Sequence, residues 1–225
     1  MMTSFATLTI GQAPRCDIMP LLLEYLPEES VTHIGLLDGM TLQQIEQRYS
    51  PGVDEPRLVS RLLDGTQVTL GSRSVEQGLQ EKIDWLEALG CETILLLCTG
   101  VFHSLQAKNA MLLEPDRIIP PLIGAIVGTH QVGIVVPVES QIAEQAIKWS
   151  RLPKAPCFAV ASPYMADEEK LTEAALALEG KGAQVVVLDC IGYHRQHRDL
   201  LQSKLGIPVL LSNVLVAKLA AELIV

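Results

Sequence analysis

Two apolar runs, ILLLCTG at residues 94–100 and VVVLDCIG at residues 185–192, decide how this chain folds. Neither run alternates apolar with polar residues. Unbroken apolar runs of this length are typical of parallel strands that are buried on both faces of a sheet. The first run comes after a helical pattern at residues 73–89, in which apolar residues recur at every third or fourth position. We therefore predict a helix that leads into a buried strand, with a cysteine at the strand's end.

The same alternation of strands and helices extends along the rest of the chain. Further strands are predicted at residues 5–10, 31–36, 67–70, 132–137, 157–161 and 208–211. Helical patterns lie between most of them, and the prolines at residues 120 and 121 indicate a break. Strands that alternate with helices predict an α/β fold with a mainly parallel sheet.

A weak internal repeat runs through this pattern. The strand that ends in GQAP at residues 11–14 matches the strand that ends at Pro137. The run that ends in LCTG at residues 97–100 matches the run that ends in DCIG at residues 189–192. The chain is therefore predicted to consist of two similar parallel-sheet α/β halves that face a central cleft.

The boundary between these halves is predicted near residues 127–131. This gives a first half at residues 1–128 and a second half at residues 129–225. The last helix, at about residues 212–225, is apolar on most sides, which is typical of a helix that is buried all round. It could pack back on the first half or lie in an oligomer interface, and we expect a homodimer.

Composition excludes several classes of protein. With 17 Lys+Arg against 26 Asp+Glu, the formal net charge is −9, and no basic cluster is present to bind nucleic acid or an anionic membrane surface. The apolar run near the middle is far shorter than the ~20 residues of a membrane-spanning helix. Residues 1–9 lack the Lys or Arg of a signal peptide, so five cysteines predict free thiols in the cytoplasm. No nucleotide-binding glycine motif is present, and no cofactor is expected.

The two cysteines at strand ends are the candidate catalytic groups. Ligands of α/β sheets bind beyond the carboxyl ends of the strands, where Cys98 and Cys190 are predicted to lie. Each thiol would face the N-terminus of the following helix, whose positive end lowers a thiol pKa. Two such groups on opposite sides of a planar intermediate can remove a proton from carbon and return one to the other face. The alternative is that both cysteines only fill the core, as free cysteine often does.

Polar groups around these cysteines could bind an anionic substrate. Backbone amides and hydroxyls that stabilise enolate charge are expected at Thr99, Gly100, Gly192, Ser212 and Asn213. The loop with Gly11, Gln12 and Arg15 is placed to contribute as well. Arg15 or Arg73 could hold a carboxylate as a bidentate clamp, although both could also be surface charges.

The histidine-rich segment after the second cysteine leaves two interpretations open. His194 could be an acid–base partner or orienting group for Cys190. Alternatively, Cys190, His194 and His197 could bind zinc, which accepts sulfur and imidazole ligands. A fourth ligand is not evident in the sequence, so no metal is expected.

The chain closely resembles the AroM family. The resemblance extends over nearly the whole chain, and the matching stretches are residues 8–11, 113–115, 117, 120–122, 132–138, 188–190, 194–201 and 208–215. No reaction is carried over from this resemblance. The family name implies an association with aromatic (shikimate pathway) biosynthesis.

More distantly, the layout is similar to the aspartate/glutamate racemase superfamily, which includes hydantoin racemases and maleate isomerases. This resemblance implies two α/β halves facing a cleft, with Cys98 and Cys190 as the cysteine from each half. Three neighbourhoods differ from the superfamily pattern: Thr99-Gly100 stands where Asn-Thr is usual, Ile191-Gly192 where Thr-His is usual, and Gln12-Ala13-Pro14 where an acidic residue and a serine are frequent. These differences count against racemisation of an ordinary amino acid.

Three hypotheses for function follow. The first is a cofactor-independent racemase-like or isomerase-like enzyme that acts on a small carboxylate or a related compound through Cys98 and Cys190. The second is a non-catalytic protein that uses the same cleft to bind or sense a small anionic metabolite. The third is an enzyme with a single catalytic cysteine, Cys190, which works together with His194.

Overall fold

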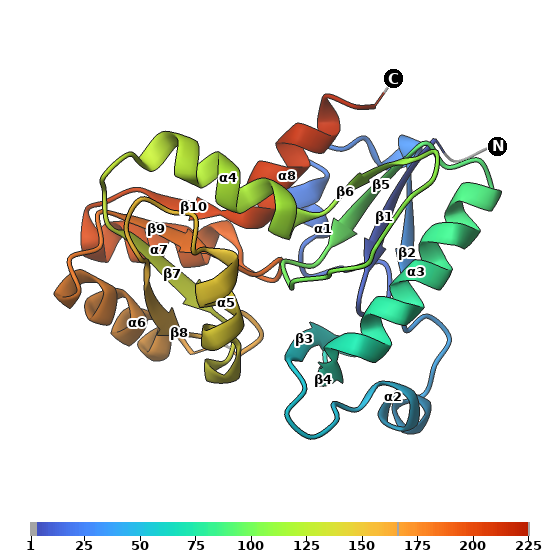
Figure 1. The fold of residues 1–225 in the computed structure, drawn as a ribbon, viewed down its shortest axis with the longest axis horizontal. Helices are drawn as coiled ribbons and strands as arrows, with labels where there is room; N and C mark the ends of the chain where they lie inside the picture. Colours follow the sequence, from blue (N-terminus) through green and yellow to red (C-terminus); the bar gives the residue numbers. More distant parts are fainter. Residues whose placement is uncertain (1–3, 166, 225) are drawn as a thin grey trace. The chain divides into compact units, whose positions relative to one another are not determined.

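The protein divides into two compact units in the computed structural model, which describes residues 4–165 and 167–224 (Figure 1). The first unit runs to Pro115 and includes the chain from Ala217 onward, and the second unit is Asp116–Val216. The predicted boundary between the repeated halves at residues 128 and 129 stays a prediction. No helix within the described ranges is long and apolar enough to cross a membrane.

The first unit contains a parallel four-stranded sheet in the order β2-β1-β5-β6. Its strands are β1 (Phe5–Thr9), β2 (Val31–Gly35), β5 (Thr93–Leu97) and β6 (Met111–Leu113). Every residue of β1 and β5 is buried. This burial on both faces explains the unbroken apolar run in β5, because no position of a central strand contacts solvent.

The second unit repeats this sheet with the same strand connections. Its strands are β7 (Val132–Val136), β8 (Cys157–Val160), β9 (Val185–Leu188) and β10 (Val209–Leu211), in the order β10-β9-β7-β8 and all parallel. Pairing β1 with β7, β2 with β8, β5 with β9 and β6 with β10 makes the two orders identical. The prediction of two similar parallel-sheet α/β halves is confirmed.

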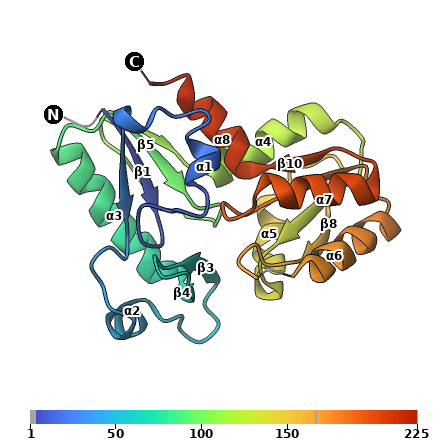
Figure 2. The same cartoon turned by 180° about the vertical axis from the view of Figure 1, so that it is seen from behind.

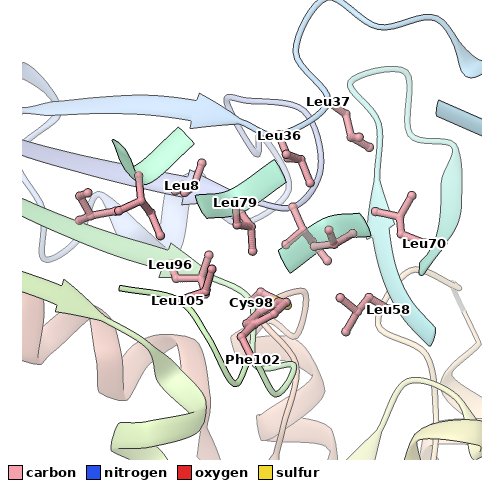
Figure 3. Packing of buried hydrophobic residues seen from close by; sticks show 14 of the residues in the cluster. Leu8, Leu36, Leu37, Leu58, Leu70, Leu79, Leu96, Cys98, Phe102 and Leu105 are labelled. Atoms are coloured by element: carbon pink, nitrogen blue, oxygen red, sulfur yellow. The ribbon is translucent and has the colours of Figure 1, made fainter. Parts of the chain in front are cut away.

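Helices flank both sheets (Figures 1 and 2). They are α1 (Met19–Leu22), α2 (Leu42–Tyr49), α3 (Ser72–Ala88), α4 (Pro115–Val127), α5 (Ile142–Lys148), α6 (Glu168–Gly180), α7 (Arg195–Leu205) and α8 (Ser212–Ala221), with short 3-10 turns at Glu28–Ser30 and Glu139–Gln141. Helix α3 has the apolar face that its sequence predicts, and Leu79 on that face packs with Leu8 of β1 and Leu96 of β5 (Figure 3). Asp167 begins α6 by accepting a hydrogen bond from the Lys170 N–H.

The strand predicted at residues 67–70 is confirmed as β4 (Gln67–Gly71), and it pairs antiparallel with β3 (Arg57–Arg61) outside the parallel sheet. One sequence expectation about these elements is wrong. The prolines at residues 120 and 121 do not break the chain but lie inside α4. A proline inside a helix costs roughly 3 kcal/mol. Complete burial of Ile119 and Ile123 on the same helix opposes that cost.

Candidate functional site

Cys98 follows β5 directly and is 8% exposed. The backbone N–H of Gly100 donates to its Sγ at 3.3 Å. The predicted helix after Cys98 does not form, and residues 99–110 instead run through bends and irregular chain into β6. A backbone amide, rather than a helix N-terminus, therefore faces this sulfur. Thr99 beside it is buried.

Strand β3 lies against the loops that follow β1 and β5. A Cβ at Gly100 would sit 2.5 Å from Leu58 Cδ2, and a Cβ at Gly11 would sit 2.5 Å from Ser60 Oγ. Leu58 packs beside Cys98 and Phe102 in the core of the first unit (Figure 3). Both glycines are needed for this close approach, since any side chain there would displace the strand. The β3–β4 hairpin thus covers the carboxyl edge of the first sheet.

Gln12 connects three loops of the first unit. Its Nε2 donates to the carbonyl oxygens of Leu37 at 3.3 Å and Met40 at 3.2 Å, and its Oε1 accepts from the Leu63 N–H at 3.0 Å. These bonds use both ends of the side-chain amide. Gln12, predicted as a substrate-binding residue, therefore fixes the loops after β1 and β2 to the turn of the hairpin.

The two arginines predicted as clamps lie in different environments. The Arg15 guanidinium is buried and forms a bidentate ion pair with Asp17, at 2.8 Å from Nε and 2.6 Å from Nη2. Arg73 is exposed at the start of α3, where its backbone N–H donates to Glu55. That bond and one from Gly52 lower the pKa of Glu55. Arg15 lines a pocket beside the hairpin turn, whereas Arg73 lines a separate depression along α3.

In the second unit, Cys190 lies two residues beyond β9 and is also 8% exposed. The hydroxyl of Tyr164 lies 3.6 Å from its Sγ. A Cβ at Gly192 would overlap the Tyr164 ring, so this glycine allows the ring to lie over the chain after Cys190. Sequence reasoning missed Tyr164, although its position in the loop after β8 obeys the same rule of ligands at carboxyl ends of strands.

Asp189, between β9 and Cys190, is the centre of a buried polar network. Its carboxylate accepts from Lys148 Nζ at 2.7 Å, Trp149 Nε1 at 3.2 Å and Ser212 Oγ at 3.1 Å. The ion-paired side chains of Lys148 and Asp189 are 2% and 0% exposed. Ser212, predicted as a substrate-binding residue, is the first residue of α8 and contacts the residue before the cysteine. The network therefore joins α5 and α8 to the peptide that leads into Cys190.

Asn213 holds the chain on the other side of Cys190. Its Nδ2 donates to the carbonyl oxygens of Ile191 and Tyr193, both at 2.7 Å. Asn213 is fully buried. Its Oδ1 has no hydrogen-bond partner among the residues that the structure describes.

His194 immediately precedes α7, and its backbone N–H donates to His197 Nδ1 at 2.9 Å. Burial and the nearby His194 lower the pKa of His197 to about 4. Burial likewise raises the pKa of Tyr193, whose hydroxyl donates to the Ala161 carbonyl. In residues 4–165 and 167–224 no three His, Cys, Asp or Glu side chains form a group that could hold a metal ion.

The predicted site residues thus gather at the carboxyl edge of each sheet. Cys98, Thr99 and Gly100 follow β5, and Gly11, Gln12 and Arg15 follow the neighbouring β1. In the second unit, Cys190, Gly192 and His194 follow β9, the counterpart of β5, and Ser212 and Asn213 follow the neighbouring β10, the counterpart of β6. Arg73 is the exception, since it follows the antiparallel β4.

Solved structures with the same fold are racemases and a decarboxylase. A glutamate racemase from Bacillus anthracis matches with a TM-score of 0.64 at 12% identity, covering 99% of this chain and 82% of that one. An allantoin racemase from Pseudomonas fluorescens gives 0.55 at 14% identity, with 97% and 90% covered. Unliganded arylmalonate decarboxylase gives 0.55 at 12% identity, with 98% and 92% covered. These structures share the fold of this chain, as the distant resemblance to the aspartate/glutamate racemase superfamily implies.

No curated protein matches the chain in sequence. The family model described as AroM protein matches residues 5–224. This match includes both sheets, the loops that carry Cys98 and Cys190, and the buried network around Asp189. The chain therefore belongs to the AroM family, and its fold is that of the aspartate/glutamate racemases.

Proposed function

We propose that this protein is a cofactor-independent enzyme of racemase or isomerase type, which moves a proton at carbon on a small carboxylate or a related compound. Cys98 and Cys190 are its two proton-transfer groups. One observation carries the proposal: each cysteine stands at the carboxyl end of the same strand of the repeated sheet, β5 in the first unit and β9 in the second. Core-filling cysteines have no reason to occupy equivalent positions in two halves that otherwise differ in sequence.

The proposed chemistry needs one thiolate and one thiol on opposite faces of the reacting carbon. The thiolate removes the proton, and the electron pair of the broken C–H bond moves into the adjacent carbonyl or carboxylate group. The thiol on the other face then gives its proton to that carbon and becomes the thiolate. Protons and electrons balance within this exchange, so no oxidant or cofactor enters the reaction.

Neighbouring groups support the two sulfurs in different ways. The Gly100 amide can stabilise a thiolate at Cys98, because it already donates to Sγ. The Tyr164 hydroxyl can do the same at Cys190. Thr99, Gly192 and His194 remain proposed contacts to the substrate or to the sulfurs.

The test is proton exchange at carbon, followed by NMR in D₂O with a panel of small acids, amino acids and hydantoins. The proposal expects loss of an α-proton signal for at least one compound. It also expects that Cys98→Ala and Cys190→Ala each abolish exchange, whereas the control Cys157→Ala, which removes a thiol whose pKa is raised by burial, retains it. Exchange that survives both single replacements contradicts the two-thiol mechanism. Loss only with Cys190→Ala favours a single thiol that works with His194.

A non-catalytic binding protein is the second candidate. The observation that favours it is the absence of a helix at residues 99–110, since Cys98 lacks the helix N-terminus expected to activate it. This alternative expects shikimate-pathway acids such as shikimate to raise the melting temperature by binding the native state. Stabilisation without deuterium exchange at any compound would select the binder over the enzyme.

A further inference from the structure

The first unit contains a pocket between the loop after β1 and the turn of the β3–β4 hairpin, which we call the hairpin pocket. Its volume is about 370 Å³, and its walls are Gln12, Pro14, Arg15, Cys16 and Asp17 on one side and residues 61–65 on the other. Neither Cys98 nor any other residue of its loop lines it. We infer that the hairpin pocket binds one small anion, a carboxylate or a phosphate, and that Arg61 is the residue that holds it.

Arg61 is fixed in position by its own turn. Its Nε donates to the Gly65 carbonyl at 3.0 Å. Gly65 has a φ of +90°, and a Cβ there would sit 3.1 Å from Arg61 Nη2, so the absence of a side chain leaves room for the guanidinium over the turn. In the described part of the chain, Nη1 and Nη2 have no hydrogen-bond or ion-pair partner. Because Nε is bonded to the turn, the two Nη groups remain to donate side by side to two oxygen atoms of one anion.

The charges around the pocket leave Arg61 as the group that selects the ligand. The other arginine of the pocket, Arg15, is neutralised by Asp17 at 2.6 Å. Asp64 is the opposing charge, and hydrogen bonds from Thr66 lower its pKa, so it is ionised at neutral pH. Its carboxylate is fully exposed and bonded to the turn, where water and salt screen it.

A hydrogen bond between the two walls of the pocket holds them in place, so a ligand can bind without first ordering the loops. The Gln12 side chain accepts from Leu63 N–H and so joins the loop to the turn. Leu62 and Leu63 give the pocket an apolar portion. A rigid guanidinium beside apolar surface, in a pocket of this volume, suits a small organic anion with a compact apolar body or a free phosphate.

Cys16 provides a reporter, because it is exposed and lines the same pocket. We would measure its rate of reaction with N-ethylmaleimide at pH 7 by peptide mass spectrometry, replacing chloride by inorganic phosphate or by acetate at constant ionic strength. The expected result is a rate that falls to a plateau as one of the two anions saturates the pocket. If only phosphate protects Cys16, the ligand is a phosphate. If acetate protects Cys16, the ligand is a carboxylate.

Matched variants make the test specific. Arg61→Gln should raise the half-protecting concentration on the order of tenfold, because a charge-assisted pair is lost. Asp64→Asn removes the opposing charge but keeps an acceptor for the turn, so it should lower the half-protecting concentration. The control Arg151→Gln, at an exposed position outside the pocket, should leave that concentration unchanged. No protection by either anion, or protection that is equal in Arg61→Gln and the unmodified protein, overturns the inference. Far-ultraviolet circular dichroism confirms that each variant is folded.

The same digest separates this inference from the proposed function. Rates at Cys98 and Cys190 are obtained for each sample, and deuterium exchange is measured on the same variants. Saturable, Arg61-dependent protection of Cys16 without exchange at any compound leaves the hairpin pocket standing while the two-thiol enzyme fails. Deuterium exchange without protection of Cys16 would support the two-thiol enzyme and overturn the inference about the hairpin pocket.

Discussion

The surroundings of Cys98 and Cys190 differ, although the same strand of the repeated sheet positions each cysteine. Around Cys98, the fold is built from backbone contacts: an amide on the sulfur and glycines that admit the β3 strand. Around Cys190, it is built from side chains: a buried ion pair before the cysteine and an asparagine that binds two carbonyl oxygens after it. Equivalent positions in the two sheets are therefore stabilised by different interactions. The surroundings of Cys190 depend more on side chains, and a single substitution can remove a side-chain contact.

The largest difference between the sites should appear when the buried ion pair is broken. Lys148→Met leaves the Asp189 carboxylate buried without its cation, which typically costs 3–5 kcal/mol, so we expect a loss of about that size in the free energy of unfolding. Glu81→Gln breaks the exposed pair with Arg48, whose partners are 70% and 55% exposed, and should cost less than about 1 kcal/mol. Urea denaturation checks both values. Equal losses in the two variants would show that the network does not support the second site.

Replacing the glycines near the two cysteines should produce a smaller difference in the free energy of unfolding than breaking the ion pair. A methyl group at Gly192 overlaps the Tyr164 ring, whereas one at Gly100 meets the end of the flexible Leu58 side chain. Overpacking costs about 1–3 kcal/mol, and we expect Gly192→Ala near the upper value and Gly100→Ala near the lower. The control is Gly180→Ala at the end of α6, where no atom lies within 4 Å of the new Cβ. That control should be neutral or stabilising, and thermal unfolding measures all three.

The smallest expected effect is a pH dependence from two histidines with lowered pKa values, His197 in the second unit and His33, whose pKa burial lowers, in the first. Because the pKa of His197 is about 4 in the folded state and 6.5 in the reference state, the unfolded chain binds more protons between these values. Stability should therefore be full above pH 6.5 and fall as the pH decreases toward 4. We expect a loss of about 1 kcal/mol between pH 7 and pH 5, since solvent screens part of the ring.

His197→Gln should reduce this slope to the part that His33 contributes, and His103→Gln, at an exposed position of the first unit, should leave it unchanged. The lowered pKa values of Glu55 and Glu87 cause losses only as the pH falls below their usual value of 4.5, so they contribute little above pH 5. An unchanged slope in His197→Gln, read from urea midpoints at pH 7 and pH 5, would contradict the assignment.

The parts of the fold that follow from local pattern could be predicted from sequence. The unbroken apolar runs of β5 and β9 indicate burial on both faces, and their repetition indicates two halves with equivalent cysteines. Strand β3 was not predicted, because its sequence RLVSR has charged ends and pairs only with a strand that lies outside the main sheet. The helix at residues 115–127 was missed for a related reason, since tertiary burial of its isoleucines overrides the local effect of two prolines.

The site was predicted less completely than the fold. Position after a strand identifies Cys98 and Cys190, but it cannot show which partner a side chain meets. Arg15 pairs with Asp17 only two residues away, so it is no longer an open clamp. The Tyr164 hydroxyl and the Lys148–Asp189 pair join positions 26 and 41 residues apart, and no spacing rule connects them.

The close approach of β3 to Gly11 and Gly100 has a consequence for protein engineering. Contacts that hold the hairpin in place lie in its strands, in those two glycines and in the backbone N–H of Leu63, whereas the side chains of its turn at residues 62–64 line the pocket. A library that varies residues 62–64, while keeping Arg61 and the positive-φ Gly65, would diversify ligand preference without disturbing the sheet beneath. Directed evolution of this scaffold should therefore begin at the hairpin turn rather than at the cysteines.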